Sequence, residues 1–142
     1  MSIDKMTLGN QMGNMIRSFA VTLQHTLSDS KIDFTMEQFA VLSILNEQEN
    51  LTQQDIASML SKDKSGILRH IDNLEKRKFV VRVADENDRR KKILIITKKG
   101  YEAITQFEKI KENIFNKIFK DLSQQQLDTF SETITTIQKN IT

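Results

Sequence analysis

The sequence predicts a mainly α-helical protein with one small β-hairpin, arranged as a winged helix-turn-helix flanked by N- and C-terminal dimerisation helices. Three observations predict this fold. Proline is absent and glycine occurs only at positions 9, 13, 66 and 100, so long helices are permitted almost throughout. Two short helical patterns follow one another, opening at Thr52 and at Lys64. Behind them, β-branched runs at 80–83 and 93–96 enclose a cationic segment, which is typical of a hairpin with a charged tip.

An N-terminal helix is predicted within residues 5–32. Its apolar residues recur at steps of three and four, which places them on one stripe: Leu8, Met12, Met15, Ile16, Phe19, Leu23 and Leu27. This stripe requires a surface to cover it.

The winged lobe is predicted over residues 34–99. Thr35 followed by Gln38 resembles a capping box and starts a helix that ends near residue 46. Thr52 and Asp55 form a similar capping pair and start a helix over about 53–60, with residues 61–63 as the turn after it. This third helix is expected to bury Ile56, Met59 and Leu60. The fourth helix, over residues 64–78, is expected to bury Ile67, Ile71 and Leu74 at the i, i+4 and i+7 positions.

Two amphipathic helices are predicted within residues 100–142, the second of them capped by Ser123 and Gln126. A winged lobe of about 60–70 residues closes its core without them. We therefore expect a homodimer, although packing on their own lobe is the alternative. The expected interface residues are Leu8, Ile114, Ile118, Leu127, Phe130, Ile134 and Ile137.

Charge is divided unevenly along the chain. Residues 61–100 hold 13 Lys and Arg against 6 Asp and Glu, a balance of +7, and the remainder holds 8 against 13, a balance of −5. A basic winged segment within an acidic frame indicates a polyanionic partner. The chain has no cysteine, no run of 18 apolar residues and no apolar signal in its first eleven residues, so we expect a cytoplasmic protein without disulfides.

If the lobe binds double-stranded DNA, the start of the fourth helix reads bases in the major groove. The residues expected to contact DNA there are Lys62, Lys64, Ser65, Leu68 and Arg69, of which Lys62 and Lys64 are assigned to phosphates. Gln53 and Gln54, at a helix N-terminus, are also expected to meet phosphates. Arg82, on the hairpin, is likewise expected to meet phosphates. The wing of the hairpin contributes Asp88, Arg89, Arg90, Lys91 and Lys92, with Arg89 and Arg90 at a tip that fits a narrow minor groove.

Neither catalysis nor a metal site is indicated. His25 is solitary, and His70 lies nearer the inward edge of its helix, where a partly buried structural role is expected. Two histidines without cysteine argue against a zinc site. A glycine-rich phosphate loop, a Gly-x-Ser-x-Gly elbow and a His-Glu-x-x-His helix are all absent from the sequence, so no cofactor is expected.

The chain resembles the MarR family of bacterial transcriptional regulators. The resemblance is carried by residues 51–60 (LTQQDIASML), 71–82 (IDNLEKRKFVVR), 85–90 (DENDRR) and 96–100 (ITKKG). It implies a homodimer whose terminal helices interlock, with Arg90 in the minor groove and Asp88 holding the wing in shape. One position departs from the family pattern: Lys78 stands where a glycine usually ends the recognition helix, so it either adopts a left-handed conformation or ends the helix differently.

The resemblance also implies a small-molecule effector, of unknown identity, bound between the dimer helices and the lobe. The candidate pocket residues are Met12, Met15, Arg17, Phe19, Phe34, Met36 and Phe39, with Arg17 as the candidate partner for a ligand carboxylate. Methionines and aromatic residues at helical spacing are also ordinary core.

The preferred function is therefore a dimeric, sequence-specific DNA-binding regulator, with repression favoured over activation by the resemblance alone. The main alternative is a winged-helix protein that coats or bends DNA with little sequence preference. An enzyme built on His25 or His70 and an adaptor whose winged fold binds protein are further alternatives.

Overall fold

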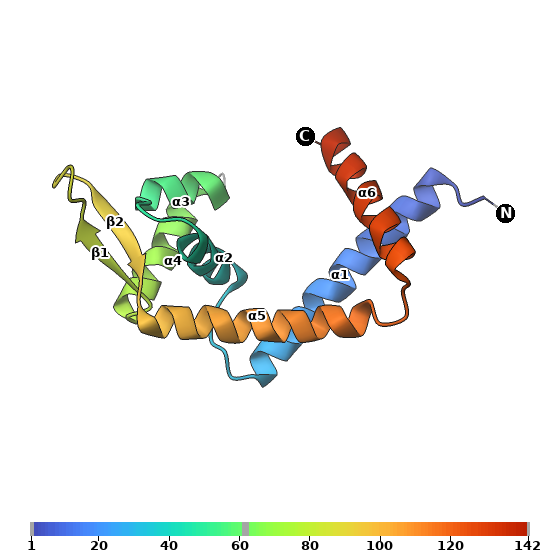
Figure 1. Ribbon diagram of the computed structural model, residues 1–142, viewed down its shortest axis with the longest axis horizontal. Coiled ribbons are helices and arrows are strands. Elements are labelled where there is room, and N and C mark those ends of the chain that lie inside the picture. The colour runs from blue at the N-terminus through green and yellow to red at the C-terminus, as the bar shows by residue number, and fades with distance from the viewer. Residues whose placement is uncertain (1, 61–62, 142) are drawn as a thin grey trace. The chain divides into compact units, whose positions relative to one another are not determined.

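The computed structural model describes residues 2–60 and 63–141 of the chain (Figure 1). Its elements are α1 (Lys5–Asp29), α2 (Met36–Glu47), α3 (Gln53–Leu60), α4 (Lys64–Lys76), β1 (Val80–Ala84), β2 (Lys92–Ile96), α5 (Lys98–Ile118) and α6 (Gln124–Ile141). The chain divides into two compact units, Met1–Ile110 and Lys111–Thr142. The predicted mainly helical fold with one small hairpin is confirmed. Within the described ranges, no helix is both long and apolar enough to cross a membrane.

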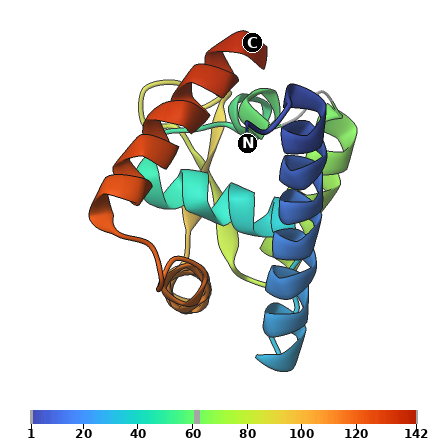
Figure 2. The same cartoon turned by 90° about the vertical axis from the view of Figure 1, so that its right-hand side faces the viewer.

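The core of the first unit lies where α2, α3, α4 and the hairpin meet. Its most deeply buried large side chains are Phe39, Val41, Leu42, Ile56, Ile71, Leu74, Val80 and Ile104. The ring of Phe39 stacks on that of Phe107, with centroids 3.7 Å apart, which holds the first part of α5 against α2. Figures 1 and 2 both show α2 between α3 and the first part of α5.

Local capping determines where the helices of the lobe begin. Thr35 and Gln38 form the expected reciprocal capping box at α2, with N–H to side-chain oxygen distances of 3.0 and 3.2 Å. At α3 the Thr52 N–H donates to Asp55 Oδ2 (2.8 Å) and the Asp55 N–H donates to Thr52 Oγ1 (3.2 Å). Such caps typically stabilise a helix by about 1 kcal/mol each.

The buried face of α4 follows the expected periodicity, whereas α3 follows it only at Ile56, because Met59 is exposed and Leu60 is half-buried. Ile67, Ile71 and Leu74 of α4 are buried as predicted. The expectation that Met59 of α3 lies inside is wrong, because Met59 is 50% exposed and Ala57 is buried in its place beside Ile56. Around the helix axis, Ala57 lies on one side of Ile56 and Met59 on the other. The side that carries Ala57 faces the core, so Met59 faces solvent.

The structure shows how α4 ends with lysine, and not glycine, at position 78. Helix α4 stops at Lys76, two residues earlier than expected, and Lys78 takes the left-handed conformation with φ 65°. Its N–H donates to the Glu75 carbonyl oxygen (2.9 Å) and the Phe79 N–H donates to the Leu74 carbonyl oxygen (2.9 Å). These two bonds form a Schellman motif, in which lysine occupies the position that glycine favours.

Strands β1 and β2 pair antiparallel, with Val80 opposite Ile96 and Ala84 opposite Lys92. The Leu94 N–H also donates to the Leu51 carbonyl oxygen (2.8 Å), which fastens the hairpin to the segment just before α3. The position of the wing relative to α3 is therefore set by main-chain hydrogen bonds as well as by side chains.

Several apolar residues at the ends of the chain remain exposed in the single chain. In α1, Leu23 and Leu27 are buried, whereas Met6, Leu8 and Met15 are exposed. In the second unit no residue of α6 is buried, and the exposed apolar side chains include Leu122, Phe130, Ile134 and Ile141. Of the expected interface residues, Ile118 is also exposed, Leu127 and Ile137 are half-buried, and Ile114 is buried.

Candidate nucleic-acid interface

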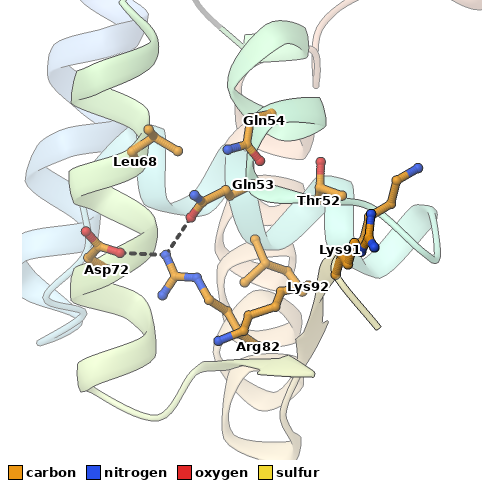
Figure 3. Close-up of a pocket in the computed structure, with 10 residues that line it drawn as sticks. Thr52, Gln53, Gln54, Leu68, Asp72, Arg82, Lys91 and Lys92 are labelled. Carbon is orange, nitrogen blue, oxygen red and sulfur yellow. Dashed lines mark hydrogen bonds and ion pairs between the residues drawn. The ribbon is translucent and has the colours of Figure 1, made fainter. Parts of the chain in front are cut away.

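A groove of about 590 Å³ opens between the start of α3, the outer face of α4 and the wing (Figure 3). It is lined by Thr52, Gln53, Gln54, Leu68, Asp72, Arg82, Arg90, Lys91, Lys92 and Leu94. Seven of these are residues that the sequence predicts to contact DNA, and the fold brings them together from three segments. Sequence reasoning did not single out Thr52, Asp72 or Leu94 as lining residues.

The exposed face of α4 carries the base-reading candidates. Lys64, Ser65 and Arg69 are exposed, and Leu68 is half-buried at the groove wall. Asp63 caps the N-terminus of α4: its Oδ1 accepts from the Gly66 N–H (3.0 Å), and a Cβ on residue 66 would collide with that carboxylate. The predicted contact Lys62 lies outside the described residues.

The wing is shaped by two aspartates. Asp88 Oδ1 accepts from the Arg90 N–H (3.1 Å), and the Asp88 carbonyl oxygen accepts from the Lys91 N–H (2.9 Å). Asp85 Oδ1 accepts from the Asn87 N–H in the same way (2.8 Å). These Asx-type turns order the backbone while the side chains of Arg89 and Arg90 stay exposed.

Arg82 lies at the base of the groove, where its side chain is 19% exposed, and joins three elements. Its Nη2 donates to Asp72 Oδ1 (2.5 Å) and to Gln53 Oε1 (2.7 Å), and its Nη1 donates to Glu75 Oε2. Burial lowers the pKa of Arg82, but the hydrogen bond to Asp72 and the charges of Glu75 and Asp72 outweigh it, so the pKa is raised. The phosphate contact predicted for Arg82 stays a prediction, made for a side chain that already has two anionic partners.

Asp55 shows that the wing also approaches α3 electrostatically. The backbone and side-chain hydrogen bonds from Thr52 hold the pKa of Asp55 below its ordinary value, and the positive charge of Lys91 lowers it further. The α3 cap and the wing are therefore coupled through charge.

A second cavity, of about 580 Å³, lies between α1 and the segment that leads into α2. Of the predicted pocket residues, Phe19, Phe34 and Met36 line it, whereas Met12, Met15 and Arg17 do not, and Phe39 is 1% exposed in the core.

Arg77, which sequence reasoning missed, contacts the wall of this cavity through Phe34. The Arg77 guanidinium lies 4.7 Å from the Phe34 ring centroid and 5.1 Å from that of Phe79, and it pairs with Asp33 at 3.8 Å. Because Arg77 caps α4, the cavity wall touches the end of that helix.

Comparison with known proteins agrees with this geometry. The model of the MarR family matches residues 34–92. An HTH-type transcriptional regulator of Bacillus subtilis, YkoM, is 31% identical over 113 residues, which cover 79% of this chain and 73% of that protein.

Solved structures share the fold. Streptococcus pneumoniae FabT in complex with DNA superposes with a TM-score of 0.86 at 18% identity, covering 97% of each chain. Bordetella bronchiseptica BpsR, whose DNA binding is regulated by 6-hydroxynicotinic acid, superposes with a TM-score of 0.74 at 22% identity, covering 92% of this chain and 91% of that one.

Proposed function

The chain belongs to the MarR family of transcriptional regulators, and from that premise we propose that it is a homodimeric repressor released by a small-molecule ligand. As a regulator of this family it is a DNA-binding protein and not an enzyme. In the proposal its partner is a palindromic operator in double-stranded DNA. Its place of action is the cytoplasm, where bacterial DNA lies.

The convergence of the wing and α4 on one groove carries this proposal. Arg90, Lys91 and Lys92 line the groove together with the N-terminus of α3, and Lys64 and Arg69 are exposed along the start of α4. A helix placed in the major groove brings a neighbouring cationic wing to the phosphates and the minor groove. Contacts with the phosphate backbone of the DNA give affinity, and the α4 side chains recognise the base sequence.

The exposed apolar residues of the terminal helices support a homodimer. Leu8 is 43% exposed, and Phe130 and Ile134 are 38% and 39% exposed, although each is large and apolar. Phe130 and Ile134 are one helical turn apart on α6, and exposed apolar side chains grouped on one helix face favour burial against a partner. A two-fold axis would pair two recognition helices at a spacing of about 34–36 Å, which is one turn of B-DNA.

The cavity beside α1 supports release by a ligand. Its volume, about 580 Å³, lies within the range of small-molecule sites, and its lining is mostly apolar. The ring of Phe34 forms part of the wall and contacts Arg77 at the end of α4. A ligand that moved Phe34 would shift the equilibrium between DNA-competent and DNA-incompetent spacings of the two lobes.

The proposal is tested by quantitative binding to the DNA upstream of the protein's own gene and to a scrambled duplex, across a salt series. Light scattering gives the mass of the complexes. We expect preferential binding of one dimer to a palindromic site. Equal and steeply salt-dependent binding to both duplexes would instead favour the non-specific DNA protein that the +7 segment 61–100 also allows. Absence of binding would favour the protein adaptor.

A further inference from the structure

The contacts of Arg82 do not suit a phosphate-binding arginine. Asp72 and Glu75 both pair with its guanidinium, so the three side chains together carry a charge of −1. The Arg82 main chain also joins this cluster, since its N–H donates to Glu75 Oε1 (3.3 Å). A phosphate that approached the cluster would meet two carboxylates as well as the one cation.

The hydrogen bond from Arg82 to Gln53 fixes the orientation of the Gln53 carboxamide. A guanidinium has donors only, so the atom of the Gln53 carboxamide that faces Arg82 must be its oxygen. The Nε2 amino group is then on the other side of the carboxamide, as Figure 3 shows. Gln53 is the first residue of α3, where backbone N–H groups and the helix dipole already favour an anion.

We propose that Arg82 is a positioning residue for DNA binding: it orients the carboxamide of Gln53 so that Nε2 donates to a phosphate at the start of α3. Through Asp72 and Glu75 the same guanidinium holds β1 against α4, so the phosphate contact and the recognition helix keep a constant spacing. This inference rests on the proposed function, since it assigns a role within the same interface.

A double-mutant cycle separates this role from a direct contact. Arg82→Met, Gln53→Ala and the double variant are titrated with operator DNA over a salt series. We expect each single change to weaken binding about tenfold and the double variant to be no weaker than the singles, because Gln53 contributes only when Arg82 orients it. The slope of log affinity against log salt should stay unchanged, because Gln53 is neutral and releases no counterion.

One control variant tests whether loss of any exposed positive charge has the same effect, and a milder substitution at Arg82 serves if the first one does not fold. Lys109→Gln removes one exposed positive charge from α5, outside the groove, and should leave both affinity and slope unchanged. If Arg82→Met fails to fold with two unpaired carboxylates, Arg82→Lys replaces it in the cycle. Lysine keeps the charge but lacks the planar fork that reaches three acceptors, so affinity should still fall without a change of slope.

The side-chain amide of Gln53 gives a readout that needs no DNA. In 15N relaxation measurements on the wild-type protein its NH2 group should be as ordered as the neighbouring backbone, and in Arg82→Met it should become mobile. An NH2 group with equal order in both proteins would overturn the inference. So would additive losses of affinity in the cycle, or a fall of roughly 0.9 in the salt slope, which is the value for one phosphate that Arg82 itself neutralises. Failure of the wild-type protein to bind any operator would instead overturn the proposed function and leave the NH2 result interpretable.

Discussion

The carbonyl oxygen of Phe79 occupies the space in which a side chain on Gly100 would begin. Thr97 tightens the same junction, since its hydroxyl donates to the Lys78 carbonyl oxygen (2.7 Å) and accepts from the Gly100 N–H (3.1 Å). The end of α4 and the start of α5 are thereby joined through main-chain atoms. Thr97 and Gly100, in the Thr-Lys-Lys-Gly sequence after β2, are therefore required by the packing at this junction.

Gly100→Ala should lower the free energy of unfolding by about 1–3 kcal/mol, because a backbone carbonyl cannot yield as a flexible side chain does. Urea unfolding followed by circular dichroism measures the change. Gly13→Ala in α1 is the matched control, since nothing lies within 4 Å of its added Cβ. It should stabilise by up to about 1 kcal/mol. Equal effects of the two substitutions would contradict the role given to Phe79.

Lys78→Gly should raise the free energy of unfolding by about 0.5–1 kcal/mol, because the left-handed conformation at φ 65° is unfavourable for a residue with a Cβ. The Schellman hydrogen bonds are made by the backbone and survive the change. Thermal and urea unfolding measure the effect. Lys76→Gly, two residues earlier and inside the helix, is the control and should be destabilising. A loss of stability in Lys78→Gly would mean that the lysine side chain makes a stabilising contact.

Arg69→Ala should weaken operator binding by about 1–3 kcal/mol and relax the preference at one base position in each half-site. The physical reason is the loss of a bidentate donor from the exposed start of α4. Binding to a set of single-base operator variants measures it. Lys76→Ala, at the far end of the same helix, should leave the preference intact. If affinity for operator and random DNA fell equally, Arg69 would be a phosphate contact.

The cap of α3 should weaken in acid. The pKa of Asp55 is lowered by its bonds from Thr52, so the stability that this carboxylate contributes is fully present above its unfolded value of about 3.9. That stability is lost as the pH falls through the folded-state pKa. The difference in unfolding free energy between wild type and Asp55→Ala should therefore shrink as the pH is lowered from 7 towards about 3. A difference that stayed constant with pH would show that the charged form is not the one that caps the helix.

Much of the fold could be predicted because its signals are local. The capping boxes at Thr35 and Thr52, the periodicity of Ile67, Ile71 and Leu74, and the paired β-branched runs each lie within a few consecutive residues. Helix starts, buried faces and strand pairing across a short turn depend on such neighbours. Met59 was misplaced because eight residues give too few turns for periodicity alone to locate the buried edge.

The site was less predictable, because its contacts join segments that are far apart in the chain. Arg82 appeared in the sequence as one more cation of the hairpin, and only the approach of α3 and α4 gives it the acceptors Asp72, Glu75 and Gln53. Arg17 is predicted as the pocket cation and lies on the same helix as the apolar stripe, yet Arg77 is the arginine that contacts Phe34.

The sequence by itself therefore determined the order and type of the elements and the concentration of positive charge in residues 61–100. Those properties follow from backbone preferences and side-chain patterns that act over one or two turns of chain. Only the tertiary structure decided which arginine is neutralised, which aromatic residues border a cavity, and why Gly100 carries no side chain. Each of these depends on the distance between atoms of separate elements, which is set by how their buried faces pack and is not encoded at any single position.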